Sequence, residues 1–392
     1  MSLLTYNIMK NRMERHVIVM AALTALGLAL SGSAAAQVQE VKLGFAAPMT
    51  GNQAQYGKDM QNGVTLALED FNATRPRING QDVRFVLVSE DDQADPKAGS
   101  VVAQKLVDGG IKGMLGHFNS GTSIPASGVY SRAGIPQISM ATAPEYTRQG
   151  FKTTFRMMTS DTQQGSVVGA YVVNRLGAKR IAIVDDRTAY GQGHADEFEK
   201  AAKAAGGSIV RREFTNDKAV DFKAVLTNLK RQSPDVVFYG GAEAQSAPLA
   251  KQMRELGMKA VLVSGEMSKT ENFIKLAGSA AEGTLCSLAG LPLDQMPGGA
   301  GYKQRYEKRF SNPVQTYSPY AYDGAMAMMK AMVQANSSDP QKYLVSLAAT
   351  STPGVTARQI AYDVRGDLKE GGITIYKVVS GKWQPVESLA GK

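Results

Sequence analysis

Short apolar runs alternate with longer amphipathic stretches along most of this chain, and this alternation constrains its fold more than any other feature. Runs such as Ile181–Val184 are apolar at every position, which is typical of parallel strands covered on both faces. The stretches between them place apolar residues three and four positions apart, as in Gln55–Phe71, and this spacing indicates helices. The pattern predicts an α/β protein with two doubly wound parallel-sheet lobes and right-handed crossovers.

The expected elements fall into two series. In the first we expect strands at 41–46, 83–88, 113–115 and 136–138, and helices at 55–71, from Pro96 after a capping Asp95, and at 123–132. In the second we expect strands at 180–184, 208–212, 236–239 and 260–263, and helices at 162–175, 193–204, 221–230 and 244–256. Residues 291–301, rich in Pro and Gly, are expected to form a long surface loop before helices at 302–310 and 320–333.

The N-terminus carries the pattern of a secretory signal peptide. Lys10, Arg12 and Arg15 precede an apolar stretch over 17–30, and the small residues of 33–36 offer a cleavage site. As a helix this stretch spans about 21 Å, too short for the core of a bilayer. We therefore expect residues 1–36 to be removed and the mature chain to be soluble and exported.

Charge and cysteine content exclude several classes of protein. The 392 residues carry a formal charge of +9 without any Lys/Arg-rich run, so we expect no nucleic-acid partner. Cys286 is the only cysteine, so no intramolecular disulfide can form, and we expect it to be a small buried residue.

Catalytic motifs are missing from the sequence. His117 and His194 are far apart and have no metal-ligand spacing, and there is neither a G-x-S-x-G nor a Walker motif. The acid pairs at 91–92 and 185–186 follow predicted strands and are interpreted as solvated loop or helix-capping carboxylates. We expect no enzyme activity, no catalytic residues, no cofactor and no metal.

Polar segments after two strands of the first series suggest a binding site for an anion. The run 115–122 leaves a strand and enters a helix, where Ser120 adds a hydroxyl to the free N–H groups at the positive end of the helix dipole. The next strand ends in 139–144, which adds Thr142. Since ligands of open α/β sheets bind beyond the carboxyl ends of strands, a carboxylate is the expected ligand group.

The second series supplies groups of another kind. Tyr190 follows one strand, and Glu266 follows another. A ligand ammonium in a closed cleft needs a negative partner, because an unpaired buried charge is costly. Glu266 is the candidate partner, and the alternative is a surface acid that caps a helix over 268–276.

Seven segments, in this order, resemble the periplasmic substrate-binding proteins of ABC importers with the type I fold, in the branched-chain amino acid branch. They are Gly51–Gly57, Asp91–Pro96, Gly116–Ser120, Ala141–Pro144, Ala189–Gly193, Tyr239–Gly241 and Gly366–Lys369. The resemblance covers essentially the whole mature chain. It implies two lobes joined by a hinge, with 37–157 plus 286–364 in lobe 1 and 158–285 plus 365–392 in lobe 2.

The resemblance also implies roles for individual residues. Ser120 and Thr142 match the site of the α-carboxylate, and Glu266 matches the ligand of the α-ammonium. Positions that line the amino acid correspond to Tyr56, Phe118, Asn119, Ala141, Tyr190 and Gly265. The implied partners are an amino acid of branched-chain, aliphatic or aromatic type and an inner-membrane ABC permease, and we expect the protein to act as a monomer.

Some residues depart from the family pattern and leave other functions open. Ala242 stands where relatives often carry a larger residue, Glu243 follows it, and Asn119 and Gln315 add polarity near the side-chain pocket. The pocket could therefore suit an aromatic or polar amino acid. The alternatives are a binder of amides, urea or aromatic carboxylates, a ligand-sensing module for a membrane receptor, and a secreted hydrolase.

Overall fold

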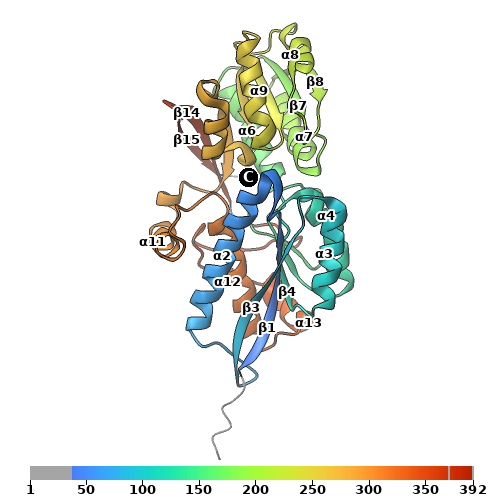
Figure 1. Ribbon diagram of the computed structural model, residues 1–392, viewed down its shortest axis with the longest axis vertical. Coiled ribbons are helices and arrows are strands. Elements are labelled where there is room, and N and C mark those ends of the chain that lie inside the picture. The colour runs from blue at the N-terminus through green and yellow to red at the C-terminus, as the bar shows by residue number, and fades with distance from the viewer. Residues whose placement is uncertain (1–37, 370, 391–392) are drawn as a thin grey trace, which may run out of the picture.

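The computed structural model describes residues 38–369 and 371–390. They form two α/β lobes stacked along the long axis of the molecule, one built on the sheet that holds β1 and one on the sheet that holds β7 (Figure 1). The signal peptide predicted at 1–36 lies outside the described residues.

The first lobe is a six-stranded sheet with helices on both faces. Its strands run in the order β2 (Arg77–Ile78), β3 (Gln81–Asp91), β1 (Gln39–Ala47), β4 (Gly113–Gly116), β5 (Gln137–Ser139) and β6 (Thr154–Arg156), all parallel except β2. Helices α2 (Ala54–Ala73) and α12 (Ser318–Gln334) cover one face, and α3 (Pro96–Asp108) and α4 (Ser120–Arg132) cover the other (Figure 1). The lobe is completed by η1 (Gly51–Gln53), α5 (Glu145–Arg148), η4 (Leu293–Gln295), α11 (Gly299–Phe310), α13 (Pro340–Ala348) and the β12–β13 ribbon (Ser351–Thr352, Ile360–Ala361).

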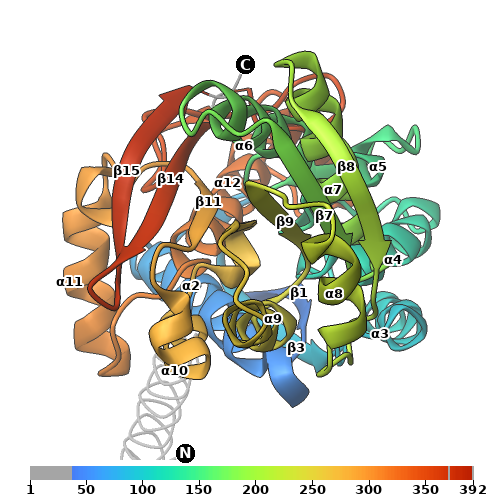
Figure 2. The same ribbon diagram turned by 90° about the horizontal axis from the view of Figure 1, so that it is seen from above.

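The second lobe is a seven-stranded mixed sheet. Its order is β15 (Lys382–Ala390), β14 (Gly372–Val379), β11 (Leu285–Ala289), β10 (Val261–Ser264), β9 (Val236–Gly240), β7 (Arg180–Asp185) and β8 (Ser208–Phe214). The hairpin β14–β15 is antiparallel and forms one edge (Figure 2). Its helices are α6 (Asp161–Asn174), α7 (Ala189–Ala204), α8 (Lys223–Lys230), α9 (Glu243–Glu255) and α10 (Glu271–Ala277), with η2 (Glu266–Ser268) and η3 (Gly278–Ala281).

Strand β7 shows why its sequence is apolar throughout. Ala182 and Val184 pack in the core beneath α8, α9 and α10, whereas Ile181 and Ile183 pack in the core beneath α6 and α7. Successive side chains of a strand point to opposite faces, so a sheet covered on both sides requires apolar residues at every position. The predicted two-lobed α/β fold is confirmed.

Several local predictions were wrong. Helix α7 begins at Ala189 and not at 193, because the Thr188 hydroxyl caps it by accepting from the N–H of Gly191 at 2.9 Å. The segment 291–301 is not a continuous loop, because it contains η4 and the start of α11. The helix expected at 268–276 begins at Glu271, where Thr270 caps it. The C-terminal hairpin was not predicted.

The division of the chain between the lobes stays a proposal. Residues 286–289, which the sequence-based division gave to lobe 1, pair in β11 with β10 and β14 of the second sheet. The Gly366 backbone instead packs against that of Thr154 in the first lobe and accepts a hydrogen bond from Arg156. By these contacts we propose boundaries near 290 and 371.

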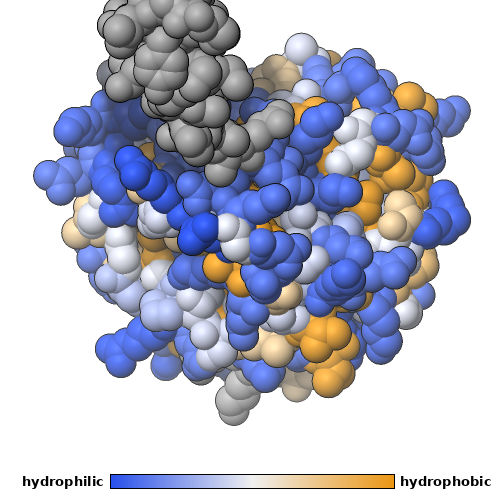
Figure 3. All heavy atoms as spheres, turned by 90° about the horizontal axis from the view of Figure 1, so that it is seen from below, coloured by the Kyte–Doolittle hydropathy of each residue, from blue (hydrophilic) through white to orange (hydrophobic). Residues whose placement is uncertain are grey.

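The face of the molecule at the end of the first lobe is mostly hydrophilic. Seen from the end of the first lobe, hydrophobic residues form only scattered small patches (Figure 3). Within residues 38–369 and 371–390, none of the helices has the length and apolar character needed to cross a membrane.

Candidate ligand-binding site

The carboxyl ends of strands from both lobes meet around a small cavity between the lobes. Segments after β4 and β5 contribute from the first lobe, and segments after β7 and β10 from the second. The lining residues are Phe118, Asn119, Ser120, Met140, Thr142, Tyr190, Glu266, Met267 and Tyr317.

The first-lobe side of the cavity presents hydroxyl and amide groups. Ser120 is the first residue of α4, and its buried hydroxyl accepts a hydrogen bond of 3.2 Å from the N–H of Ala143. Thr142 is buried beside it. The first N–H groups of a helix lack intrahelical acceptors and carry partial positive charge, so this corner suits an anion.

Arg156 supports that corner from below. Its guanidinium is fully buried, pairs with Asp367 at 2.8 Å, and donates to the carbonyl oxygens of Ala141 and, at 3.2 Å, Ala143. Arg156 therefore holds both neighbours of Thr142 and adds positive charge beneath the anion corner.

The second-lobe side of the cavity is acidic. Glu266 lies in η2, directly after β10, and is only 3% exposed. Asp161, at the start of α6, and His194, in α7, are fully buried next to it. Potential ligand atoms of these three residues all lie within 4.8 Å of one another.

Burial sets the protonation of this acidic group. It raises the pKa of Glu266 to about 7 and lowers the pKa of His194 to about 4. Burial, followed by the charge of Glu266, raises the pKa of Asp161 well above its ordinary value. The shifts mean that the two carboxylates are fully ionised near neutral pH only when a cation joins them.

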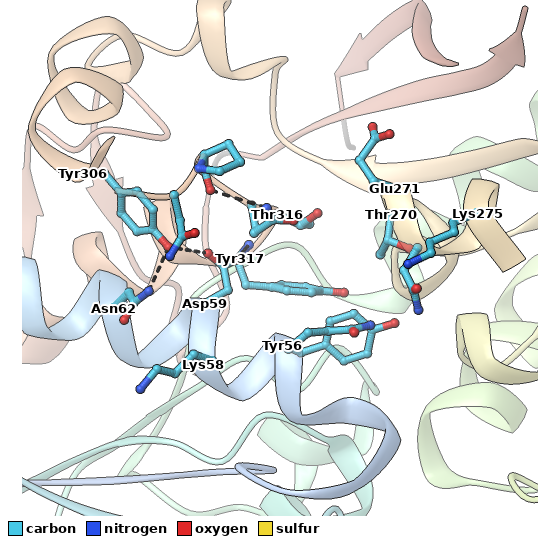
Figure 4. A pocket seen from close by; sticks show the side chains of 15 residues that line it. Tyr56, Lys58, Asp59, Asn62, Thr270, Glu271, Lys275, Tyr306, Thr316 and Tyr317 are labelled. Atoms are coloured by element: carbon cyan, nitrogen blue, oxygen red, sulfur yellow. Dashed lines mark hydrogen bonds between the residues drawn. The ribbon is translucent and has the colours of Figure 1, made fainter. Parts of the chain in front are cut away.

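An aromatic wall closes one side of the cavity. The ring of Phe118 stacks on that of Tyr56 with centroids 5.3 Å apart, and Tyr317 meets both rings edge-on at 4.8 and 5.6 Å. Tyr56 and Tyr317 also line an outer cavity of ≈ 440 Å³ between α2, α10 and the loop before α12 (Figure 4). The two tyrosines therefore separate the inner cavity from the outer one.

Glu243 links the two lobes beside this wall. Its buried carboxylate, at the start of α9, accepts hydrogen bonds from Gln55 of the first lobe, from the Thr270 hydroxyl, and from Asn272 at 2.8 Å. We call Glu243, Gln55, Thr270 and Asn272 the latch.

Most of the predicted site residues come together. Six of the nine line the inner cavity: Phe118, Asn119, Ser120, Thr142, Tyr190 and Glu266. The other three lie next to the cavity. Tyr56 stacks on Phe118 in the aromatic wall, and the carbonyl oxygen of Ala141 accepts a hydrogen bond from Arg156. Gly265 precedes Glu266 and lies close to the Tyr190 hydroxyl. Their contacts with a ligand stay predictions.

The interpretation of two acid pairs as solvated was wrong in part. Asp92 is fully buried and lies 2.7 Å from Nδ1 of His117, and Asp185 is fully buried and pairs with Arg212 at 2.8 Å. Likewise, Glu266 is no surface acid. Asp92 follows a strand, Asp185 ends one, and Glu266 lies two residues beyond one. Polar residues at such positions resemble loop residues in the sequence, and only the packing of the neighbouring elements buries them.

Six residues were not predicted as parts of this region: Asp161, Arg156, Glu243, Met140, Met267 and Tyr317. Asp161 follows Ser160, which forms a capping box with Gln163, so in sequence it has the pattern of an ordinary helix start. Tyr317 precedes Ser318 and Pro319 at the start of α12, a position that carries no motif. Among the six, only Glu243 was marked in the sequence, because it stands beside a residue that departs from the family pattern.

This chain is similar to known proteins over most of its length. The sequence profile of the family described as periplasmic binding protein matches residues 40–382. Leu/Ile/Val-binding protein homolog 1 of Brucella melitensis is 35% identical over 355 residues, which cover 90% of this chain and 94% of that protein. A leucine-, isoleucine-, valine-, threonine- and alanine-binding protein of Pseudomonas aeruginosa is 31% identical over 370 residues, covering 94% and 97% of the two chains.

A solved structure has the same fold. The crystal structure of a leucine binding protein from Thermotoga maritima superposes with a TM-score of 0.81 at 23% identity and covers 89% of this chain and 98% of that one. The predicted resemblance and the type I fold are confirmed. With a family profile that matches most of the chain and a relative 35% identical over 90% of it, this chain belongs to the periplasmic binding protein family.

Proposed function

We propose that this protein binds an amino acid, of branched-chain or related aliphatic or aromatic type, between its lobes and delivers it to an inner-membrane ABC permease. One observation carries the proposal: a single small cavity is lined by Ser120 and Thr142 on one side and by the buried carboxyl group of Glu266 on the other. The two sides complement the opposite charges of a zwitterion.

Charge pairing would make closure depend on the ligand. The first lobe accepts the carboxylate, and the second lobe accepts the ammonium, so only a ligand with both groups contacts both lobes fully. A ligand shifts an equilibrium between open and closed forms by its differential affinity for the two. A ligand without the amino group would leave Glu266 either charged and unpaired or protonated without its proper partner, and both lower the affinity.

The aromatic wall and the names of the relatives support an apolar ligand side chain. Phe118 and Tyr317 line the cavity, and Tyr56 stacks on Phe118. The relatives carry names that state leucine, isoleucine and valine binding. Asn119 is the polar exception in this wall, since its Nδ2 donates to Gln53 at 2.6 Å while its Oδ1 has no hydrogen-bond partner among the described residues.

Export and partners complete the proposal. The family name supports a periplasmic location, and residues 1–36 have the composition of a signal peptide. The protein then acts as a monomeric binding component, not as an enzyme. Mass spectrometry of the protein from a periplasmic extract tests cleavage near residue 36, and its mass in solution tests the monomer.

Calorimetry with matched ligands tests the binding site. We expect leucine or phenylalanine to bind, and the corresponding 2-oxo acids to bind at least about 10³-fold more weakly, as when a site's hydrogen-bonding groups are left unpaired. Glu266→Gln should remove this discrimination. Glu271→Gln, an exposed acid on α10, is the matched control and should keep it. Equal affinities for the amino and oxo acids in the unaltered protein would refute the assignment of Glu266, and tight binding of amides or aromatic carboxylates instead would favour the alternative ligands.

A further inference from the structure

Two buried histidines beside aspartates differ sharply in their hydrogen bonding. Nδ1 of His117 lies 2.7 Å from Asp92, and Nε2 of that ring lies 3.1 Å from the Tyr130 hydroxyl. Both nitrogens of His194 have no hydrogen-bond partner within residues 38–369 and 371–390, although the side chain is fully buried. Buried polar groups are nearly always satisfied, so His194 lies where a partner is expected.

The carboxyl groups beside His194 also contain atoms without hydrogen-bond partners. Both carboxylate oxygens of Asp161, and Oε2 of Glu266, also have no hydrogen-bond partner in the part of the chain that the structure describes. These side chains are fully buried or 3% exposed, and their ligand atoms lie within 4.8 Å of one another. One imidazole and two carboxyl groups, each with at least one unpaired atom and all buried close together, have the chemistry to hold a cation.

The backbone of Gly265 makes room for this arrangement. A Cβ atom at position 265 would lie 2.5 Å from Cε1 and 2.6 Å from Nδ1 of His194, and 2.4 Å from the Tyr190 hydroxyl oxygen. A larger residue at position 265 would therefore displace the imidazole of His194 or the hydroxyl of Tyr190. The present positions of the His194 and Tyr190 side chains thus depend on a glycine at 265.

One separation, between His194 and Asp161, favours a metal ion over an ammonium at this point. Nδ1 of His194 and Oδ1 of Asp161 are 3.7 Å apart, too far for a hydrogen bond. Two ligand atoms about 2.1 Å from a tetrahedral zinc ion are about 3.4 Å apart. Two acceptors about 2.9 Å from one ammonium nitrogen are about 4.7 Å apart. The observed separation is closer to the value for a metal.

We propose that Asp161, His194 and Glu266 form a zinc site in the cleft, and that zinc and the amino acid exclude each other. Imidazole nitrogen and carboxylate oxygen are ordinary zinc ligands, and two carboxylates balance the charge of a divalent ion. Exclusion follows because Glu266 is also the proposed ammonium ligand, and a zinc ion and an ammonium bound to the same buried carboxylate would repel each other strongly. This second part rests on the proposed function, whereas zinc binding itself does not.

Titration of the metal-stripped mature protein with zinc chloride, without amino acid, tests the site. We expect one zinc per chain. Loss of a group that only supports a metal ligand lowers metal affinity by about 10–100-fold. His194→Gln removes a ligand itself, so it should weaken zinc binding by at least that factor. Asp161→Asn should have a similar effect. His117→Gln is the matched control, because it alters the other mature-chain histidine outside the site, and it should bind zinc as the unaltered protein does.

The results test three claims separately: the zinc site, the mutual exclusion of zinc and amino acid, and the proposed function. Thermal unfolding without zinc checks that the variants fold, and the two site variants serve as independent tests. Failure of the unaltered protein to bind zinc, or equal zinc binding by His194→Gln and His117→Gln, would overturn the site. If saturating zinc leaves the affinity for leucine unchanged, mutual exclusion is wrong. Zinc binding without any amino-acid binding would retain the zinc site while refuting the proposed function.

Discussion

The phenol hydroxyl of Tyr56 donates a hydrogen bond of 2.8 Å to the carbonyl oxygen of Met267. Tyr56 lies on α2 of the first lobe, and Met267 follows Glu266 in the second, so this bond joins the lobes beside the proposed ammonium ligand. We expect the bond to break when the lobes separate.

Tyr56→Phe should weaken ligand binding while leaving the stacked contact with Phe118 in place. A neutral hydrogen bond contributes about 1 kcal/mol net, which corresponds to about a fivefold lower affinity for leucine by calorimetry. Tyr343→Phe is the matched control, because its hydroxyl also donates to a carbonyl at 2.8 Å, that of Lys112, within the first lobe. It should lower the unfolding free energy and leave affinity unchanged. Equal affinities for Tyr56→Phe and the unaltered protein would show that the bond does not favour closure.

The latch around Glu243 should control ligand release. Hydrogen bonds to a charged group contribute about 1.5–3 kcal/mol, so Gln55→Ala should raise the dissociation rate by about 10–150-fold with little effect on the folding of either lobe. Asn272→Ala removes a bond to the same carboxylate inside the second lobe and should change the rate less.

Trp383 provides the signal for that measurement. It is the only tryptophan, and its indole N–H donates to the carbonyl of Thr270 at 2.8 Å. Stopped-flow fluorescence during displacement of leucine by excess competitor should report latch opening. If Gln55→Ala and Asn272→Ala release ligand equally fast, the contact between the lobes does not limit release.

Sequence patterns predicted the parts of this protein that depend on local rules. The strand at 180–184 and the cap at Asp95 followed from periodicity and capping chemistry, and the polar strand ends located Ser120, Thr142 and Glu266. Parallel strands end at one edge of a sheet, so residues at strand ends could be assigned to one region without coordinates.

The remainder of the site depends on contacts between distant segments. His194 lies on a helix face toward α6, and no spacing relates it to Asp161, 33 positions earlier. Gln55 and Glu243 meet only across the lobes. Sequence periodicity reports burial of a residue, but not which distant element covers it, so the acidic cluster and the latch could not be predicted.

Arg156 should be essential for the stability of the anion corner. Removing one partner of a buried pair costs about 3–5 kcal/mol, so Arg156→Met should lower the unfolding free energy of the ligand-free protein by about that amount. Arg175, whose pair with Glu387 is exposed, is the control, and Arg175→Met should cost less than about 1 kcal/mol. Urea denaturation measures both. A cost for Arg156→Met near that of the control would mean that Arg156 does not hold the corner.

Binding and stability should depend on pH in opposite directions through Glu266. Its pKa is raised by burial from 4.5 to about 7, so in this range the folded, ligand-free protein holds a proton that the unfolded chain has lost. The contribution of this group to stability is therefore complete below pH 4.5 and decreases as the pH rises toward 7. Pairing with an ammonium requires the ionised carboxylate, so affinity should rise with pH, by about tenfold between pH 6 and pH 8 for a pKa of 7.

The groups around Glu266 do not reverse that trend. His194 is neutral across this range because its pKa is lowered to about 4, and burial keeps the Tyr190 hydroxyl protonated. Asp161 has a raised pKa as well and adds to the trend in the same direction. Calorimetry with leucine from pH 6 to 8 should show the rise, and Asp161→Asn should reduce it. A pH-independent affinity would mean that the ammonium does not pair with these carboxylates, because a buried acid must lose its proton before it can balance a cation.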